Sequence, residues 1–163
     1  MRIVTVGFLH TSPVHVPAFR ALLAEVAPGV ADVHLVDEAL LAERAVAGGG
    51  RVAVVAAVES TLGPTRQLFE ECAAACGSAA VVVDAPCLEA WALFEAGDHA
   101  GYHELIARHV RGLAEDFDVV VLAQASMAPA AALLADLAVP VLSSPRLAVA
   151  RAVAIASAVG ATS

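Results

Sequence analysis

Short runs of apolar residues alternate along this chain with stretches whose apolar residues recur at helical spacing. The apolar runs predict strands at 3–9, 33–36, 52–58, 79–83, 119–123 and 139–142. The remaining stretches predict helices at 14–27, 38–47, 64–76, 88–96, 102–117, 130–138 and 145–159. Alternating strands and helices form crossover units around a parallel sheet, and strands apolar on both faces are typical of a sheet covered on both sides. The pattern therefore predicts an α/β fold, a three-layer sandwich with a parallel sheet.

The composition supports a packed core. Hydrophobic residues make up 60% of the 163 residues and charged residues only 16%, which excludes a disordered chain. A chain of this length holds about one domain, or two very small ones. It buries a substantial core without disulfide or metal staples.

The expected strands divide unevenly between the two parts of the chain. Residues 48–144 hold four of them and are expected to form a complete C-terminal α/β domain. Residues 1–47 hold only two, which indicates a partial N-terminal α/β domain. The closing helix, within 145–163, is a candidate to pack with that partial domain. Because a partial domain leaves apolar surface exposed, we expect a homo-oligomer.

The charge balance excludes two classes of partner. The chain has 9 basic and 17 acidic residues, a net charge of −8, and it shows no concentrated positive face for a nucleic acid or an anionic membrane surface. No apolar run reaches the ~18–20 uncharged residues that a membrane-spanning helix needs. Three cysteines without a signal sequence fit a reduced, cytoplasmic location. We therefore expect a cytoplasmic protein with no nucleic-acid and no membrane partner.

Hydroxyl side chains followed by proline mark four of the expected strand ends. These segments are Phe8–Pro13, Val58–Thr65, Ala123–Pro129 and Leu142–Pro145. Strand-to-helix loops of a parallel sheet lie at its carboxyl edge, where helix N-termini present unpaired N–H groups and positive dipole ends. Such an edge suits a small anion such as a carboxylate. The alternative is that each Ser or Thr before a proline is an ordinary helix N-cap.

Two further residues near strand ends are candidates for chemistry. His10 lies beside Thr11 and Ser12 in a carboxyl-edge loop, which makes it a candidate acid or base toward a bound substrate. Cys87 follows a strand and opens a helix, a setting that lowers the pKa of a thiol. A structural role is the alternative for both.

The residues give no metal site and no phosphate-binding loop. Cys72 and Cys76 lie four residues apart, as do His99 and His103. We interpret the cysteines as small core residues and the histidines as part of a solvated helix face. The glycines at 48–50 precede a strand instead of following one, so they do not form a phosphate cradle.

Four segments carry motifs with a family resemblance. They are FLHTSPVHVP at 8–17, VAVVAAVESTLGPT at 52–65, VVVLAQASM at 119–127 and VPVLSSPRLAVAR at 139–151. In that order they resemble the N-terminal substrate loop, the threonine-rich loop, the second cysteine strand and the last strand of the aspartate/glutamate/hydantoin racemase superfamily. The resemblance covers most of the chain. It implies a sandwich of the Asp/Glu racemase type, with its second domain complete and its first domain partial.

The resemblance also implies a chemistry without cofactors. In that superfamily two cysteines face each other across a cleft, one thiolate removing the α-proton of a small carboxylate substrate and the other thiol returning a proton. Carried over to this chain, Ser60 and Thr61 hold the substrate carboxylate, with Thr11 and Ser12 opposite. Ser143, at the last strand end, is a further substrate-binding candidate.

Both catalytic cysteine positions are unfilled in this chain. Gln124 and Ser126 stand where the second cysteine is expected, and together with His10 they are the candidate catalytic residues. Gln does not take a proton, and Ser is a poor base without a partner. The block with the first cysteine is absent near Leu41, where the second expected strand runs almost directly into the entry of the second domain.

Three hypotheses about function follow. The first is a cofactor-independent isomerase or racemase acting on a small amino-acid-like or other carboxylate. The second is a non-catalytic relative that binds a small carboxylate or acts as a subunit of an assembly. The third is a signalling domain of flavodoxin-like topology, which needs an acidic cluster at strand ends. Only Asp37, Glu38, Glu59 and Asp84 come close to forming one.

Overall fold

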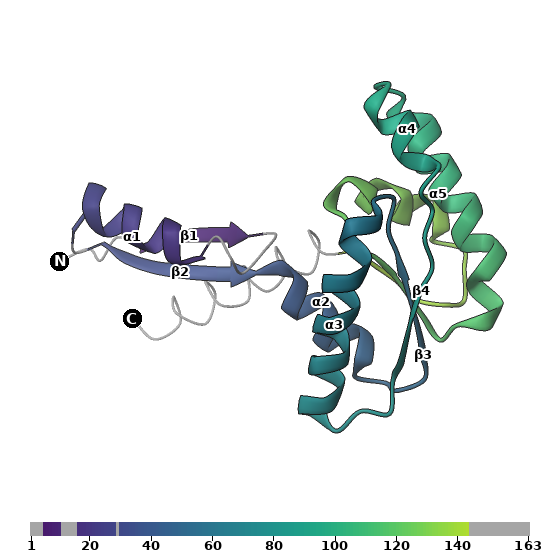
Figure 1. The fold of residues 1–163 in the computed structure, drawn as a ribbon, viewed down its shortest axis with the longest axis horizontal. Helices are drawn as coiled ribbons and strands as arrows, with labels where there is room; N and C mark the ends of the chain where they lie inside the picture. The colour runs from purple at the N-terminus through teal and green to yellow at the C-terminus, as the bar shows by residue number, and fades with distance from the viewer. Residues whose placement is uncertain (1–4, 11–15, 29, 144–163) are drawn as a thin grey trace.

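Two parallel sheets lie within the residues that the structure, a computed structural model, describes: 5–10, 16–28 and 30–143. The smaller sheet pairs β1 (Thr5–His10) with β2 (Ala31–Val36), and α1 (Val16–Val26) lies between them in the chain. In Figure 1 this part lies to one side of the larger sheet, and β2 leads directly into α2 (Asp37–Val46). The expected closing helix at 145–159 falls outside the described residues.

The larger sheet has four parallel strands in the order β4-β3-β5-β6. They are β3 (Arg51–Val55), β4 (Val81–Asp84), β5 (Val119–Leu122) and β6 (Val141–Ser143). The chain passes from β3 to β4 on one side, crosses to β5 on the other side of β3, and continues outward to β6. The parallel pairing confirms the α/β fold that the alternating sequence pattern predicts.

Helices cover both faces of this larger sheet (Figure 1). On one face α2 packs with α3 (Glu59–Cys76), and on the other α5 (His99–Leu113) packs with the 3-10 helix η3 (Ala125–Leu134). The short helices α4 (Ala90–Glu95) and η2 (Ala114–Asp116) precede and follow α5. The larger sheet is therefore the middle layer of three.

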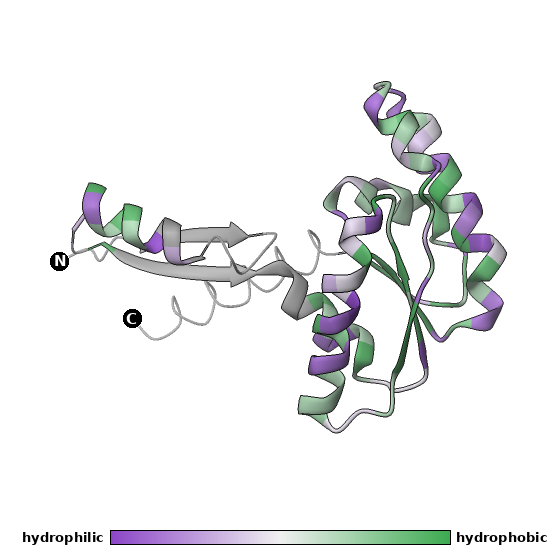
Figure 2. Cartoon of the chain, in the orientation of Figure 1, coloured by the Kyte–Doolittle hydropathy of each residue, from purple (hydrophilic) through white to green (hydrophobic). Residues whose placement is uncertain are grey.

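The sequence of β3 shows why both faces need cover. Val52 and Val54 pack against α2 and α3, whereas Ala53 and Val55 pack against α5 and η3. All four side chains are fully buried, because successive residues of a strand point to opposite faces. Figure 2 shows the strands of this sheet coloured as hydrophobic, while α3 and α5 also carry hydrophilic residues.

Helix α2 contributes to the core of the larger sheet. Its residues Leu41, Ala42, Ala45 and Val46 are buried in the cluster that also contains Phe69 of α3. The helix thus lies within residues 1–47, the expected N-terminal domain, yet it packs against strands of the expected C-terminal domain, residues 48–144. That division remains a prediction.

Two helices begin five residues earlier in the chain than the sequence pattern predicts. The expected helix at 64–76 begins at Glu59, so Ser60 and Thr61 lie in its first turn instead of in a preceding loop. Pro64 is accommodated inside the helix, where it removes one backbone hydrogen bond. The expected helix at 130–138 is η3, a 3-10 helix that begins at Ala125 with the bond from Met127 N–H to the Gln124 carbonyl (3.0 Å).

Within residues 5–10, 16–28 and 30–143, no helix is both long enough and apolar enough to cross a bilayer.

Candidate functional site

The carboxyl edge of the larger sheet contains a topological switch point between β3 and β5. The connection from β3 runs to β4, whereas β5 and its connection run to β6 on the opposite side. Loops that diverge in this way leave a crevice at the carboxyl ends of the strands, the usual ligand position in open α/β sheets. The predicted substrate-binding and catalytic residues of the second domain follow these strands.

The first turn of α3 carries Ser60 and Thr61 at this edge. Val58, extended at φ −120° and ψ 123°, precedes the helix without a side-chain capping bond, and Thr61 N–H donates to the Val58 carbonyl at 3.1 Å. Ser60 is exposed and Thr61 is half-buried. The positive end of the helix dipole and the unpaired N–H groups of the first turn therefore lie at the same end of α3 as these two residues. Glu59, also exposed in this turn, adds a negative charge that opposes an anion.

Gln124 bridges the ends of β3 and β5. Its Oε1 accepts a hydrogen bond from the Ala57 backbone N–H at 2.6 Å, and Ala57 is almost fully buried. The side-chain oxygen therefore satisfies a buried donor at the end of β3. Gln124 holds the switch point together, and its predicted catalytic role remains a prediction.

Ser126 belongs to a hydrogen-bonded group on α5 and η3. Its hydroxyl shares a hydrogen bond of 2.9 Å with the phenol of Tyr102, and the ring Nε2–H of His103 donates to its carbonyl at 3.0 Å. Tyr102 is fully buried, and burial raises the pKa of its phenol although the bond to Ser126 lowers it in part. The phenol stays protonated, so it offers Ser126 no base.

The remaining predicted site residues have different positions. Ser143 ends β6, is 9% exposed and pairs in register with Leu122 of β5. His10 ends β1, opposite Val36 in the smaller sheet. Thr11 and Ser12 lie outside the described residues. The structure thus gathers Ser60, Thr61, Gln124, Ser126 and Ser143 along one edge and leaves the N-terminal candidates as predictions.

The thiol of Cys87 differs from the sequence-based expectation. The setting at a strand end predicts a lowered pKa, but burial and then the nearby Glu89 carboxylate raise the pKa of this thiol to about 11. The expectation of a lowered pKa was wrong because the side chain turns into the core, where it is fully buried. Cys72 is half-buried and also has a raised pKa, again mainly through burial.

Sequence reasoning missed a grouping around Cys87. Its sulfur, a carboxylate oxygen of Glu89 and a ring nitrogen of His109 all lie within 4.8 Å of one another. The available signal was the spacing of Cys87 and Glu89 in a loop after a strand. Only the fold brings in His109, which lies on α5.

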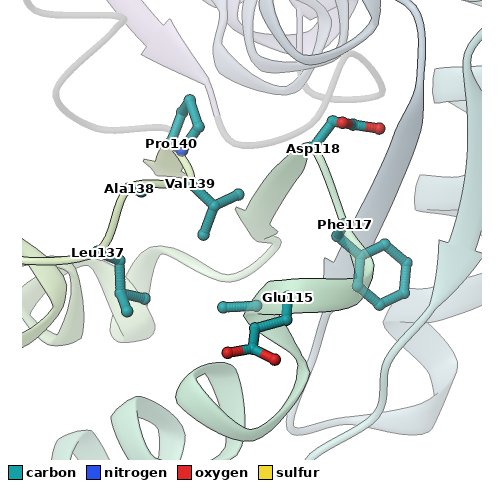
Figure 3. A pocket seen from close by; sticks show the side chains of 8 residues that line it. Glu115, Phe117, Asp118, Leu137, Ala138, Val139 and Pro140 are labelled. Carbon is teal, nitrogen blue, oxygen red and sulfur yellow. The ribbon is translucent and has the colours of Figure 1, made fainter.

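The cavity shown in Figure 3 lies at the other edge of the sheet. It measures about 480 Å³, and its lining includes Glu115, Phe117, Asp118 and residues 137–140 at the amino ends of β5 and β6. Asp118 accepts a hydrogen bond from the Arg51 N–H at 2.8 Å. Two carboxylates and apolar walls do not suit a carboxylate ligand, so this cavity does not extend the candidate site.

No family model matches this chain, and no curated protein matches it. The resemblance to the racemase superfamily therefore depends on the four sequence motifs alone.

Proposed function

We propose that this chain binds a small carboxylate at the carboxyl edge of β3 and β5, as a non-catalytic relative of the Asp/Glu racemase superfamily. The observation that carries the proposal is the first turn of α3, which brings the hydroxyls of Ser60 and Thr61 to a topological switch point. N–H groups and hydroxyls at a helix N-terminus bind anions without a charged side chain. The four motifs support the same choice of ligand.

The positions of the cysteines favour binding over two-base racemisation. Cys72 and Cys76 lie in the last part of α3, away from its first turn. Cys87 is fully buried, so its sulfur is not exposed to a substrate at this edge. At the position of the second family cysteine, Gln124 Oε1 already accepts a hydrogen bond from Ala57 N–H.

The isomerase hypothesis remains a second candidate. One observation favours it: the hydroxyl of Ser126, at the position of the second family cysteine, lies 2.9 Å from the Tyr102 phenol. A protonated phenol and a hydroxyl form a proton-donating pair toward a substrate carbanion. Such a pair suits one-base chemistry, with the base contributed from elsewhere.

Titration with malonate and with both enantiomers of aspartate tests the binding proposal. We expect Ser60→Ala to weaken binding at least about tenfold, since a hydrogen bond to a charged group contributes about 1.5–3 kcal/mol. Glu59→Gln, which removes the like charge from the same turn, is expected to strengthen binding. Gln67→Ala, further along α3, is the matched control and leaves the affinity unchanged. If Ser60→Ala and Glu59→Gln both bind these ligands with the affinity of the wild type, the proposed pocket is wrong.

Exchange of the α-proton separates the two candidate functions. Aspartate is incubated with the protein in deuterated water, and deuterium at the α-carbon is followed by proton NMR. The binding proposal expects no exchange above the protein-free rate. Exchange that Tyr102→Phe abolishes would instead establish the isomerase hypothesis.

A further inference from the structure

Three side chains of metal-ligating type meet beside the carboxyl end of β4. Cys87 and Glu89 come from the loop that leads into α4, and His109 comes from α5. The Cys87 sulfur and Glu89 Oε1 are 3.9 Å apart, and a ring nitrogen of His109 lies within 4.8 Å of both atoms. None of these residues belongs to the proposed carboxylate site.

We propose that Cys87, Glu89 and His109 bind a divalent transition-metal ion, with Zn²⁺ as the best fit. Thiolate, imidazole and carboxylate are the three ligand types that zinc takes in proteins. A soft thiolate ligand disfavours Mg²⁺ and Ca²⁺, which take oxygen ligands. The proposal is independent of the carboxylate-binding function.

The separation of the Cys87 sulfur and Glu89 Oε1 is close to that in a tetrahedral site, whereas the ring nitrogen of His109, within 4.8 Å of both, has to move closer on metal binding. With Zn–S of about 2.3 Å and Zn–N or Zn–O of about 2.0–2.2 Å, ligand atoms lie about 3.3–3.6 Å apart. The separation of 3.9 Å between the Cys87 sulfur and Glu89 Oε1 exceeds this by only a few tenths of an ångström. Glu89 is exposed, so rotation of its side chain closes the difference without moving the backbone.

Hydrogen bonds orient two of the three ligands. Cys87 N–H donates to the Ala56 carbonyl at 2.8 Å, and the Cys87 carbonyl accepts from Ala90 N–H at 3.1 Å. The ring Nε2–H of His109 donates to the Ala85 carbonyl at 3.3 Å, which leaves Nδ1 for a metal. A metal-ligating histidine commonly donates its second ring N–H to a backbone carbonyl in this way. Cys87 and His109 are thus oriented before a metal binds, and Glu89 completes the set.

A neighbouring cavity provides room for a fourth ligand. It measures about 400 Å³ and is lined by Glu89, Leu105, Arg108, His109, Gly112 and Leu113. Two of the proposed ligands therefore face an open space. Three protein ligands with one open position are typical of a zinc ion that carries water or another exogenous ligand.

Zinc titration of the full chain, freed of metal with a chelator, tests the proposal. We expect one Zn²⁺ per chain by competition with a chromophoric chelator. Cys87→Ser and Glu89→Gln are each expected to weaken binding at least about tenfold, an effect that even indirect partners of a metal can have. Cys76→Ser and Glu95→Gln are the matched controls, both at exposed positions, and should bind as the wild type does.

Cobalt provides a readout that depends on the sulfur. Co²⁺ bound to the wild type should show a thiolate-to-metal charge-transfer absorption that Cys87→Ser lacks. Because Glu89 is exposed, Glu89→Gln tests the site even if Cys87→Ser fails to fold. Absence of stoichiometric zinc binding overturns the proposal, and so does a stoichiometric site that Glu89→Gln leaves unchanged.

Discussion

At the scale of the residue, Gln124 shows how a predicted catalytic position can have a structural task. Its Oε1 accepts the N–H of Ala57, which is 2% exposed. A buried donor that loses its acceptor costs about 1–3 kcal/mol. The family motif predicts a catalytic position at the sheet edge, and in the structure the side-chain oxygen at that position binds the backbone.

Substitution of Gln124 separates the structural task from catalysis. We expect Gln124→Leu to lower the free energy of unfolding by about 1–3 kcal/mol, because Ala57 N–H loses its acceptor. Gln124→Glu keeps an acceptor oxygen and should lose less. Urea denaturation measures both, with Gln67→Leu on the exposed face of α3 as the control. A Gln124→Leu variant as stable as the wild type would show that the bond to Ala57 contributes nothing.

At the scale of the element, the packing of α3 on α2 depends on one aromatic side chain. Phe69 is fully buried among residues of both helices and of β3. No other aromatic ring lies in this described core cluster, so Phe69 fills a volume that the surrounding Ala and Val side chains leave. Its loss opens a cavity between the helical layer and the sheet.

Truncation of Phe69 measures that packing. We expect Phe69→Ala to lower the free energy of unfolding by about 3–5 kcal/mol, and Phe69→Leu to lower it less. Leu133→Ala, at a position that is 46% exposed on η3, should stay within about 0.5 kcal/mol of the wild type. Chemical denaturation with two probes checks all three. A small effect of Phe69→Ala would mean that α2 closes onto the sheet without the ring.

The elements were largely predictable from the sequence, because Val-rich runs and helical spacing are local signals. The start of α3 was not, since Ser-Thr before Pro64 looks like a cap followed by the first helical residue, yet the helix begins at Glu59. The grouping of Ser60, Thr61 and Gln124 at the carboxyl edge could be predicted, because these residues come shortly after the neighbouring strands β3 and β5. The grouping of Cys87 with His109 could not, because it needs His109 of α5, 22 residues further on, to lie beside the loop.

At the scale of the whole molecule, β4 is an edge of the larger sheet. It pairs with β3 on one side and stands last in the strand order. Val81, its first residue, is 54% exposed. An edge strand with an exposed apolar residue is a template for pairing with another chain, so the expected homo-oligomer has a specific candidate surface here.

Sedimentation of the full chain tests this surface. We expect the wild type to sediment as a dimer or larger species, and Val81→Lys to shift it toward the monomer, because a charge on an edge strand opposes pairing. Leu22→Lys, at an exposed position of α1 in the N-terminal part, tests the alternative surface. A monomeric wild type would contradict the expected oligomer. Dissociation by Leu22→Lys alone would move the contact surface to α1.

Two side-chain hydrogen bonds that link the ends of β3 to residues flanking β5 also determine when β3 is completed during synthesis. Arg51 N–H is bound by Asp118 at one end of β3, and Ala57 N–H by Gln124 at the other, each 67 residues further along the chain. In a nascent chain that ends before β5, β3 can pair with β4 but not with β5, so one side of β3 is unpaired. Contacts between distant residues close late, so a long part of the chain leaves the ribosome before this strand is enclosed. During that interval β3 is open to chaperones and to other nascent chains.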